Sequence, residues 1–409
     1  MKYIDFVDLA YRPGEDDLVC DFYVETYDKE TAKMAGGVAA ESSIGTWTEL
    51  GTMKAYMKKL QAVVFDISKN TVRIAYPMEL FELGNIPNIL SSIAGNVFGL
   101  KDLKNLRLGD VSIPERMVAS FKGPKYGIAG IRKLVNVSHR PLVGTIIKPK
   151  LGLNPQDHAE VAFDAWLGGC DIVKDDENLS NQIFNPFEER LLKTLDRRDK
   201  AEEQTGEKKM YIPNVTSETN EMIKRTEFVA DQGGEYVMID ILTCGFAALQ
   251  TLRDQDLDVI IHAHRAGHAA FTKNPKHGIA MQVIAKISRI AGVDQLHVGA
   301  AVGKMSETRE EVLMSCEALR GKMNGLKKVM PVASGGLHPA LVPSLINIFG
   351  TDFIVQAGGG IHGHKLGTVA GAKAMRQAVD AAVAHIELEE YAASHSELHA
   401  ALETWKYIS

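Results

Sequence analysis

Eight short apolar runs recur between residues 142 and 356, and stretches of helix length separate them. The runs lie at 142–147, 171–173, 210–215, 236–239, 259–262, 296–298, 329–333 and 353–356. Strands that alternate with helices pair in parallel. Eight such units can close into a (β/α)8 TIM barrel of about 250 residues. An open, doubly wound sheet would show the same alternation, so the count alone leaves closure undecided.

One intervening stretch shows the helical pattern clearly. From Glu311 to Met323, apolar side chains including Val312 and Leu319 recur at helical spacing. Thr308 and Glu311 have the spacing of a capping box, which satisfies free N–H groups at a helix start. The sequence therefore predicts a helix over 311–323.

The N-terminal part has a different rhythm. β-like runs at 18–24 and 71–76 alternate with helix-like stretches at 30–40 and 90–94. We expect a smaller α+β domain of ferredoxin-like type over residues 1–123, followed by the catalytic barrel over 124–409.

Composition limits the function classes. The chain has 409 residues, 45% of them hydrophobic, and a net charge of −6, which argues against a general binder of nucleic acid or anionic membranes. The N-terminus lacks the apolar core of a signal peptide, and no stretch approaches the roughly 18 apolar residues of a membrane span. The four cysteines form no C-x-x-C pair. We expect a cytoplasmic protein.

Polar or glycine-rich residues follow nearly every apolar run. In a barrel, the loops after the strands form the mouth of the active site. The residues are Lys148 and Lys150, Lys174-Asp175-Asp176-Glu177, His264, Arg265 and His268, His297, Lys304, Ser334-Gly335-Gly336 and Gly358-Gly359-Gly360. Their shared position predicts a single active site.

The run Lys174-Asp175-Asp176-Glu177 follows the second apolar run directly. Such a charge run alone is more often a solvated turn. At a strand end, however, it would point into the barrel mouth, where carboxylates suit Mg²⁺. An ammonium is a poor ligand, but Lys174 carbamylated by CO₂ would become a third oxygen ligand and a possible base.

His262 and His264 allow a competing interpretation. Residues two apart on a strand share a face, and an H-x-H pair can hold Zn²⁺ in a metal-dependent hydrolase. Arg265 beside them is instead suited to phosphate. For His262 alone we favour a hydrogen-bonded core histidine, and for His264 a functional role.

Two glycine motifs resemble nucleotide-binding loops. Gly358-x-Gly360-x-x-Gly363 formally matches the dinucleotide fingerprint, but no further βαβ unit follows it. A phosphate cradle is favoured, because barrels often bind phosphate after the seventh and eighth strands. The segment 299–304 is one residue short of a Walker loop, and Met305 replaces the required Ser or Thr. We interpret it as a mobile loop that presents Lys304.

Five segments resemble the large subunit of ribulose-bisphosphate carboxylase/oxygenase (RuBisCO). They are Gly144-Thr145-Ile146-Ile147-Lys148-Pro149-Lys150-Leu151-Gly152-Leu153, Lys174-Asp175-Asp176-Glu177-Asn178, His264-Arg265-Ala266-Gly267-His268-Ala269, Ala39-Ala40-Glu41-Ser42-Ser43-Ile44-Gly45-Thr46-Trp47 and Gly95-Asn96-Val97-Phe98-Gly99. The resemblance covers almost the whole chain. The compact length and the absence of an extended C-terminal tail are most similar to the archaeal form III enzymes.

The resemblance implies a metal centre and a reaction. Lys174, carbamylated by an activator CO₂, would bind Mg²⁺ together with Asp176 and Glu177, and its carbamate would remove the C3 proton of ribulose bisphosphate. Lys148, supported by Lys150, would help enolisation and protonate the final carbanion.

The resemblance also implies roles around the substrate. Lys304 would steady the developing carboxylate while a second CO₂ adds, and His264 would assist hydration and cleavage to two 3-phosphoglycerates. Arg265 and His297 would hold one phosphate, with Ser334 near the substrate hydroxyls. The residues implied for the second phosphate or for contacts from the N-terminal domain are Glu41, Thr46, Trp47, Asn96, Gly336, Gly358 and Gly359.

The family resemblance favours a carboxylase with an oxygenase side reaction. The alternative is a RuBisCO-like enolase or isomerase that acts on another phosphorylated keto compound. The presence of the carboxylation set Lys148, Lys304, Glu41, Asn96 and His297 favours the carboxylase. The implied assembly is a homodimer with shared active sites, possibly a higher oligomer of dimers, without a small subunit.

The sequence departs from the common family pattern at several positions. Gly267 stands where methionine is usual, and Ile44 where threonine is usual. After Lys304, Met305-Ser306-Glu307 replaces the usual Leu-Glu-Gly. These changes bear on loop closure, turnover and CO₂/O₂ discrimination.

Overall fold

The computed structural model describes residues 2–27, 30–303 and 307–405. The chain forms two compact units. Unit 1 comprises 1–123, 267–291 and 322–326, and unit 2 comprises 124–266, 292–321 and 327–409. Unit 1 thus includes two segments that lie beyond residue 123 in the sequence.

Unit 1 is built on a five-stranded sheet with the order β10-β4-β1-β3-β2. β1 pairs antiparallel with β3 and β4, whereas β10 is parallel to β4. The elements are β1 (Asp17–Thr26), α1 (Thr31–Glu41), β2 (Val63–Ser68), β3 (Thr71–Pro77), α2 (Ile86–Ile93), β4 (Leu103–Ser112), α3 (Glu115–Val118), α9 (Ala269–Thr272), β10 (Gly278–Ile279) and α10 (Met281–Ala291).

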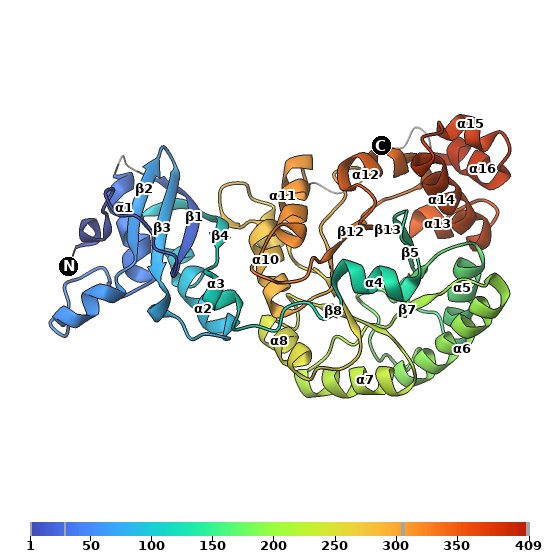
Figure 1. Ribbon diagram of the computed structural model, residues 1–409, viewed down its shortest axis with the longest axis horizontal. Helices are drawn as coiled ribbons and strands as arrows, with labels where there is room; N and C mark the ends of the chain where they lie inside the picture. Colours follow the sequence, from blue (N-terminus) through green and yellow to red (C-terminus); the bar gives the residue numbers. More distant parts are fainter. Residues whose placement is uncertain (1, 28–29, 304–306, 406–409) are drawn as a thin grey trace. The chain divides into compact units, whose positions relative to one another are not determined.

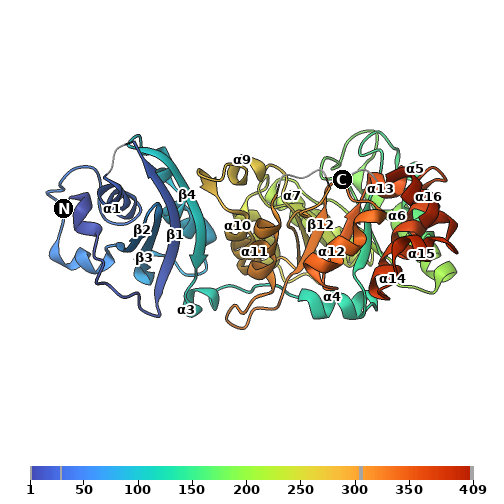
Figure 2. The ribbon, with the colours of Figure 1, turned by 90° about the horizontal axis from the view of Figure 1, so that it is seen from above.

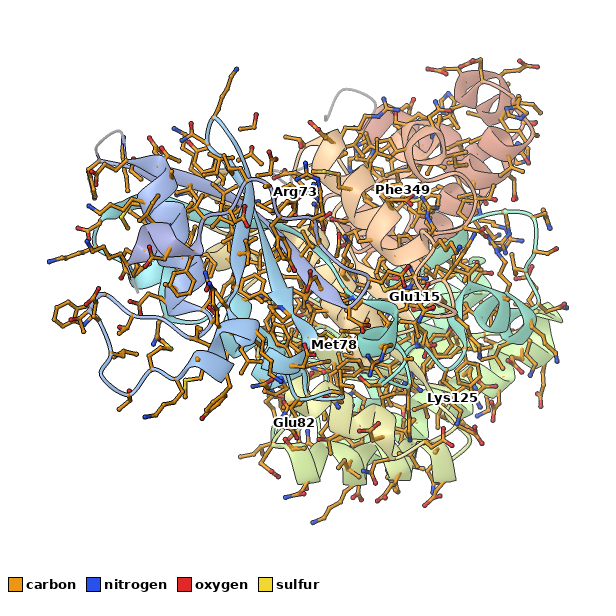
Figure 3. All side chains as sticks on the ribbon, turned by 60° about the vertical axis from the view of Figure 1, so that its left-hand side comes forward. Arg73, Met78, Glu82, Glu115, Lys125 and Phe349 are labelled. Atoms are coloured by element: carbon orange, nitrogen blue, oxygen red, sulfur yellow. The ribbon has the colours of Figure 1, made fainter. Side chains whose placement is uncertain are left out.

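The residues of β1 alternate in burial. Cys20, Phe22 and Val24 are buried, and the residues between them are less so, as expected for side chains that alternate between two faces. Arg73, which Figure 3 labels, lies on β3. Its Nε is 3.0 Å from Oδ1 of Asp21 on the neighbouring strand β1. The predicted strands at 18–24 and 71–76 are therefore confirmed.

Unit 2 contains a sheet of eight parallel strands with the order β7-β6-β5-β13-β12-β11-β9-β8. The strands are β5 (Leu142–Ile146), β6 (Ile172–Lys174), β7 (Met210–Ile212), β8 (Tyr236–Asp240), β9 (Ile260–His264), β11 (Gln295–His297), β12 (Met330–Ser334) and β13 (Ile354–Ala357). A parallel bridge between Asn214 and Met238 connects the β7 and β8 ends of the sheet. The sheet is therefore a barrel, and each of the eight predicted apolar runs is one of its strands.

The helices of unit 2 are arranged around this barrel and beyond its last strand, with α5 to α8 on its outside (Figure 1) and α14 packed on α16 (Figure 2). They are α4 (Gly127–Val135), α5 (Pro155–Leu167), α6 (Phe187–Thr205), α7 (Thr219–Asp231), α8 (Phe246–Asp254), α11 (Arg309–Arg320), α12 (Val342–Phe349), α13 (Gly359–His362), α14 (Thr368–Val383), α15 (Leu388–Ala392) and α16 (Ser396–Trp405). No helix in the described ranges is long and apolar enough to cross a membrane.

Local sequence signals set several of these helix ends. Asn154 accepts a hydrogen bond from the backbone N–H of Asp157 at 2.9 Å and caps α5. The predicted capping box of Thr308 and Glu311 is present at the start of α11. This helix ends at Arg320, three residues earlier than predicted, because Gly321 is a poor helix former.

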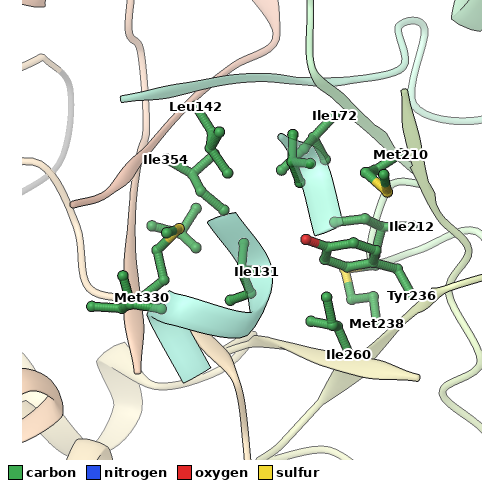
Figure 4. Close-up of a cluster of buried hydrophobic side chains, with 13 residues drawn as sticks. Ile131, Leu142, Ile172, Met210, Ile212, Tyr236, Met238, Ile260, Met330 and Ile354 are labelled. Carbon is green, nitrogen blue, oxygen red and sulfur yellow. The ribbon is translucent and has the colours of Figure 1, made fainter. Parts of the chain in front are cut away.

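A cluster of buried apolar side chains fills one end of the barrel (Figure 4). Most of its strand residues are the first of their strands, such as Leu142, Ile172, Tyr236 and Ile354, and the others lie two positions further along. Ile131 of α4 packs among them. Because α4 closes the end where the strands begin, the polar residues at the strand ends are left for the opposite, open end.

Candidate active site

Lys174 is the last residue of β6 and is buried. Its Nζ donates to the backbone oxygen of Asp175 at 2.8 Å and lies 3.8 Å from Oε2 of Glu177. Burial lowers the pKa of this amine, although the nearby carboxylates oppose the shift. This shift increases the share of the neutral amine, which is the form that reacts with CO₂.

Asp176 faces the loop that follows β5. Its Oδ2 accepts a hydrogen bond from Nζ of Lys148 at 2.8 Å, and its Oδ1 accepts one from the backbone N–H of Asn178 at 3.2 Å. Burial alone would raise the pKa of Asp176, but the hydrogen bonds from Lys148 and the Asn178 backbone, together with the charges of Lys148 and Lys174, outweigh it, so the pKa lies below its usual value. The carboxylate is therefore ionised and lies beside a cation.

Asp175 points away from this mouth, into the barrel wall. Its fully buried carboxylate accepts from the Tyr211 hydroxyl at 2.7 Å, from the backbone N–H of Asn214 at 2.9 Å and from Nε of Arg190 at 3.1 Å. His158 Nε2 lies 3.0 Å from it. Asp175 thus ties the end of β6 to β7 and α6. Alternation along the strand, with Lys174 and Asp176 on one side, is the sequence signal that could have found this role.

Replacing Asp175 with asparagine should destabilise the fold, whereas the same change at Asp176 should mainly affect activity. Asp175→Asn leaves Arg190 without its buried counter-ion, which costs about 3–5 kcal/mol. Chemical unfolding of the two variants, followed by circular dichroism, compares them directly. Equal loss of stability in both variants would contradict the division of roles between these neighbouring carboxylates.

His264 is the last residue of β9 and lies between the carboxylates of Asp240 and Glu177 and the ring of His297. Its Nδ1 lies 2.6 Å from Oδ1 of Asp240, and its Nε2 lies 3.7 Å from Oε2 of Glu177. The ring of His297 on β11 is 4.9 Å from that of His264, and Nδ1 of His297 lies 2.7 Å from the Ser334 hydroxyl at the end of β12. Strand ends far apart in the sequence therefore meet at one mouth.

Asp240 is a site residue that the sequence analysis missed. It is the last residue of β8, and it also accepts from the backbone N–H of Ala266 at 3.2 Å. Its carboxylate holds Nδ1 of His264, which leaves Nε2 turned toward Glu177. The available signal was its position directly after the apolar run 236–239.

His262 is a buried core histidine, as favoured from the sequence. Its Nδ1 lies 2.7 Å from Oε1 of Gln295, and its Nε2 lies 2.9 Å from Nε2 of His297. Burial lowers the pKa of His262 to about 3, so its ring is neutral. Both ring nitrogens already have hydrogen-bond partners within the barrel.

The glycine-rich loops follow β12 and β13, the last two strands of the barrel in the sequence. Gly336 follows β12 with φ of +74°, a backbone conformation that favours glycine. A Cβ on Gly358, after β13, would come within 3.0 Å of Cε of Lys148, so the missing side chain gives that lysine its space. Gly359 begins α13 beside it, with open space where a side chain would stand.

The other predicted site residues divide between the two units. Lys150 is exposed on the loop after β5, and Arg265 follows β9. Lys304, Met305 and Ser306 lie outside the described residues. Four residues belong to unit 1, namely Glu41, Thr46, Trp47 and Asn96. Of these, Glu41 ends α1 and accepts from the Tyr3 hydroxyl at 2.8 Å, while Trp47 is 81% exposed.

Comparison with known protein families shows which family this chain belongs to. The family model for the ribulose bisphosphate carboxylase large chain, catalytic domain, matches residues 127–405, and the model for its N-terminal domain matches residues 5–117. The chain belongs to the RuBisCO large-chain family. The resemblance seen in the five sequence segments is thus confirmed.

Archaeal RuBisCO proteins are similar over their full length. Proteins named ribulose bisphosphate carboxylase from Methanosarcina mazei and Pyrococcus furiosus are each 50% identical, over 98% and 99% of this chain and 99% and 98% of their own. An octameric RuBisCO structure from Pyrococcus horikoshii is 48% identical with a TM-score of 0.96, covering 100% of this chain and 98% of its own. A dimeric archaeal RuBisCO from Hyperthermus butylicus is 45% identical with a TM-score of 0.92, covering 99% and 100%.

The carboxylates that follow β6 fit the ligand preference of Mg²⁺. Asp176 and Glu177 supply two carboxylates, the ligand type that Mg²⁺ prefers. Within the described ranges, no group of three or more His, Cys, Asp and Glu side chains is placed to hold a metal ion. A carbamate on Lys174 would add a third protein oxygen beside these two carboxylates. The same finding gives no support to a zinc site at His262 and His264.

Proposed function

We propose that this RuBisCO-family chain is a Mg²⁺-dependent ribulose-1,5-bisphosphate carboxylase with an oxygenase side reaction, which converts its substrate and CO₂ into two 3-phosphoglycerates. The observation that carries the proposal is the buried amine of Lys174 beside Asp176 and Glu177, at the barrel mouth where Lys148 and His264 also lie. The archaeal relatives are named as carboxylases, which favours this function over that of a RuBisCO-like enolase or isomerase.

Each charged group at the mouth has a proposed task. When bound by carbamylated Lys174, Asp176 and Glu177, Mg²⁺ would stabilise negative charge on the substrate oxygens. The Lys174 carbamate would take the C3 proton of ribulose bisphosphate. Lys148, which the Asp176 carboxylate holds at 2.8 Å, would return a proton to the final carbanion.

The histidines would act on the hydrated intermediate and the phosphate. Asp240 orients His264 through Nδ1, so that Nε2 is available to move a proton during hydration and cleavage. Arg265 and His297 would hold one phosphate, and the backbone around Gly336, Gly358 and Gly359, with Thr46 and Trp47, the other. Lys304 would steady the new carboxylate, and Lys150 would support Lys148.

The proposed assembly is a homodimer, possibly part of a larger oligomer of dimers, without a small subunit and in the cytoplasm. The dimeric and octameric states of the structural relatives support oligomers of this kind. The four unpaired cysteines, three of them buried, suit a reducing compartment.

The direct test is incorporation of ¹⁴CO₂ into 3-phosphoglycerate by purified protein supplied with ribulose bisphosphate. We expect label in both the acid-stable product and chromatographically identified 3-phosphoglycerate. Conversion of ribulose bisphosphate to an unlabelled isomer would instead favour the enolase or isomerase alternative. Absence of any turnover after preincubation with CO₂ and Mg²⁺ would overturn the proposed function.

A further inference from the structure

Arg265 is held by a carboxylate from its own chain. Its Nη2 donates to Oε1 of Glu307 at 2.6 Å, and the side chains of the two residues are only 5% and 10% exposed. Burial lowers the pKa of the guanidinium, and the charge of Glu307 counteracts that shift. The two residues therefore form a desolvated, charge-assisted pair.

The backbone is shaped to admit this pair. Gly299, after β11, has φ of +86°, and a Cβ there would lie 3.1 Å from Nη2 of Arg265 and 3.1 Å from Cδ of Glu307. A side chain at this position would crowd both partners at once. The pair thus belongs to a fitted arrangement of three segments rather than to a chance meeting of exposed side chains.

We infer that Glu307 acts as a built-in competitor of the substrate phosphate, occupying the Arg265 guanidinium until a bisphosphate displaces it. This inference rests on the proposed function in one respect, the assignment of Arg265 to a phosphate. The geometry supports it because guanidinium N–H groups bind carboxylate and phosphate oxygens in the same manner. A phosphate dianion that accepts the N–H now bound to Oε1 of Glu307 must displace that carboxylate.

The residue with this proposed role, Glu307, differs from the residue that is usual in the resembled family. Glu307 is one of the residues at which this chain departs from the pattern of that family, where glycine is usual in the segment after Lys304. The expected consequence concerns binding rather than chemistry: Glu307 raises the substrate concentration needed for saturation. Glu307 thus lowers phosphate affinity by acting through Arg265.

The test measures binding of inorganic phosphate and of ribulose bisphosphate by titration calorimetry. Glu307→Gln keeps the size and a hydrogen-bond acceptor but removes the charge. A hydrogen bond to a charged group is worth about 1.5–3 kcal/mol, so phosphate affinity should rise on the order of tenfold to a hundredfold. The KM for ribulose bisphosphate should fall, while kcat should not rise in proportion.

The matched control is Glu310→Gln, which removes the same charge three residues further on, from an exposed position in the first turn of α11. It should leave phosphate affinity and KM unchanged. Arg265→Leu combined with Glu307→Gln should lose the gain, because the gain requires the guanidinium. Glu307→Asp should retain part of the competition.

Phosphate affinity that is unchanged or weaker in Glu307→Gln would overturn the inference, since Glu307 would then be neutral or would pre-position Arg265 for the ligand. A gain of equal size in Glu310→Gln would show only a general charge effect and would also overturn it. If Glu307→Gln is destabilised, calorimetry below its unfolding transition and the Glu307→Asp variant still decide the question. Phosphate binding needs no turnover, so a failed carboxylation assay leaves this result independent.

Discussion

Lys174→Ala should abolish carboxylation, with a loss of activity on the order of 10⁴-fold or more, because one change removes a metal ligand and a general base together. Lys174 is buried at the end of β6, 3.8 Å from Glu177. Alanine can form no carbamate, so only the two carboxylates of Asp176 and Glu177 would remain. Initial rates of ¹⁴CO₂ fixation over a range of Mg²⁺ concentrations measure the loss.

The fold should survive this change. Burial disfavours the charged form of the Lys174 amine, so its removal costs little electrostatic stabilisation. It also leaves no fully buried ion unpaired, in contrast to a change in the Asp175–Arg190 pair. Far-ultraviolet circular dichroism and thermal unfolding should therefore match the wild type closely. Lys133→Ala, an exposed change on α4 in the same unit, controls for the removal of one lysine.

Activation provides a second readout of the same residue. Wild-type activity should rise after preincubation with CO₂ and Mg²⁺ before substrate is added, and ¹³CO₂ should give a carbamate signal in the NMR spectrum. Lys174→Ala should show neither effect. Substantial carboxylase activity in the variant, or an unchanged carbamate signal, would place the metal site elsewhere.

The barrel could be predicted from the sequence because each buried parallel strand is a short run of apolar residues. Each run can be recognised from its own residues, without knowledge of its partners in the sheet. The change from apolar to polar residues indicates where each strand ends. The strands extend one or two residues further at Lys174, His264 and Ser334 than the apolar runs suggest. A polar side chain does not prevent its backbone from pairing in a ladder, so hydropathy alone places these ends too early.

Features that depend on contacts distant in sequence could not be predicted. β10 is only Gly278–Ile279, yet it pairs with β4 about 170 residues earlier. Alternation along β6 indicates the side to which Asp175 points, but not that Tyr211 and Arg190 are its partners there. The pairing of Glu307 with Arg265 likewise depends on the space beside Gly299. Residue type and spacing identify groups capable of chemistry, but the partner that each group takes is decided by packing.

Activity should return when two inactive proteins exchange subunits, if each active site is built from two chains as the family resemblance implies. One protein carries Glu41→Gln in unit 1, and the other carries Lys174→Ala in unit 2. Glutamine at position 41 can still accept the hydrogen bond from Tyr3, so the local structure should be retained. Each variant alone should be inactive or nearly so.

The arithmetic of a two-fold dimer makes this test decisive. In a heterodimer, one shared site receives both defects and the other receives neither, because each site takes unit 1 from one chain and unit 2 from its partner. Random exchange makes half of the dimers mixed, so about a quarter of wild-type activity should return. Differently tagged chains show that exchange has occurred, and two copies of the same variant serve as the control. If each site were instead built within one chain, every site in the mixture would carry one defect, and no activity would return after proven exchange.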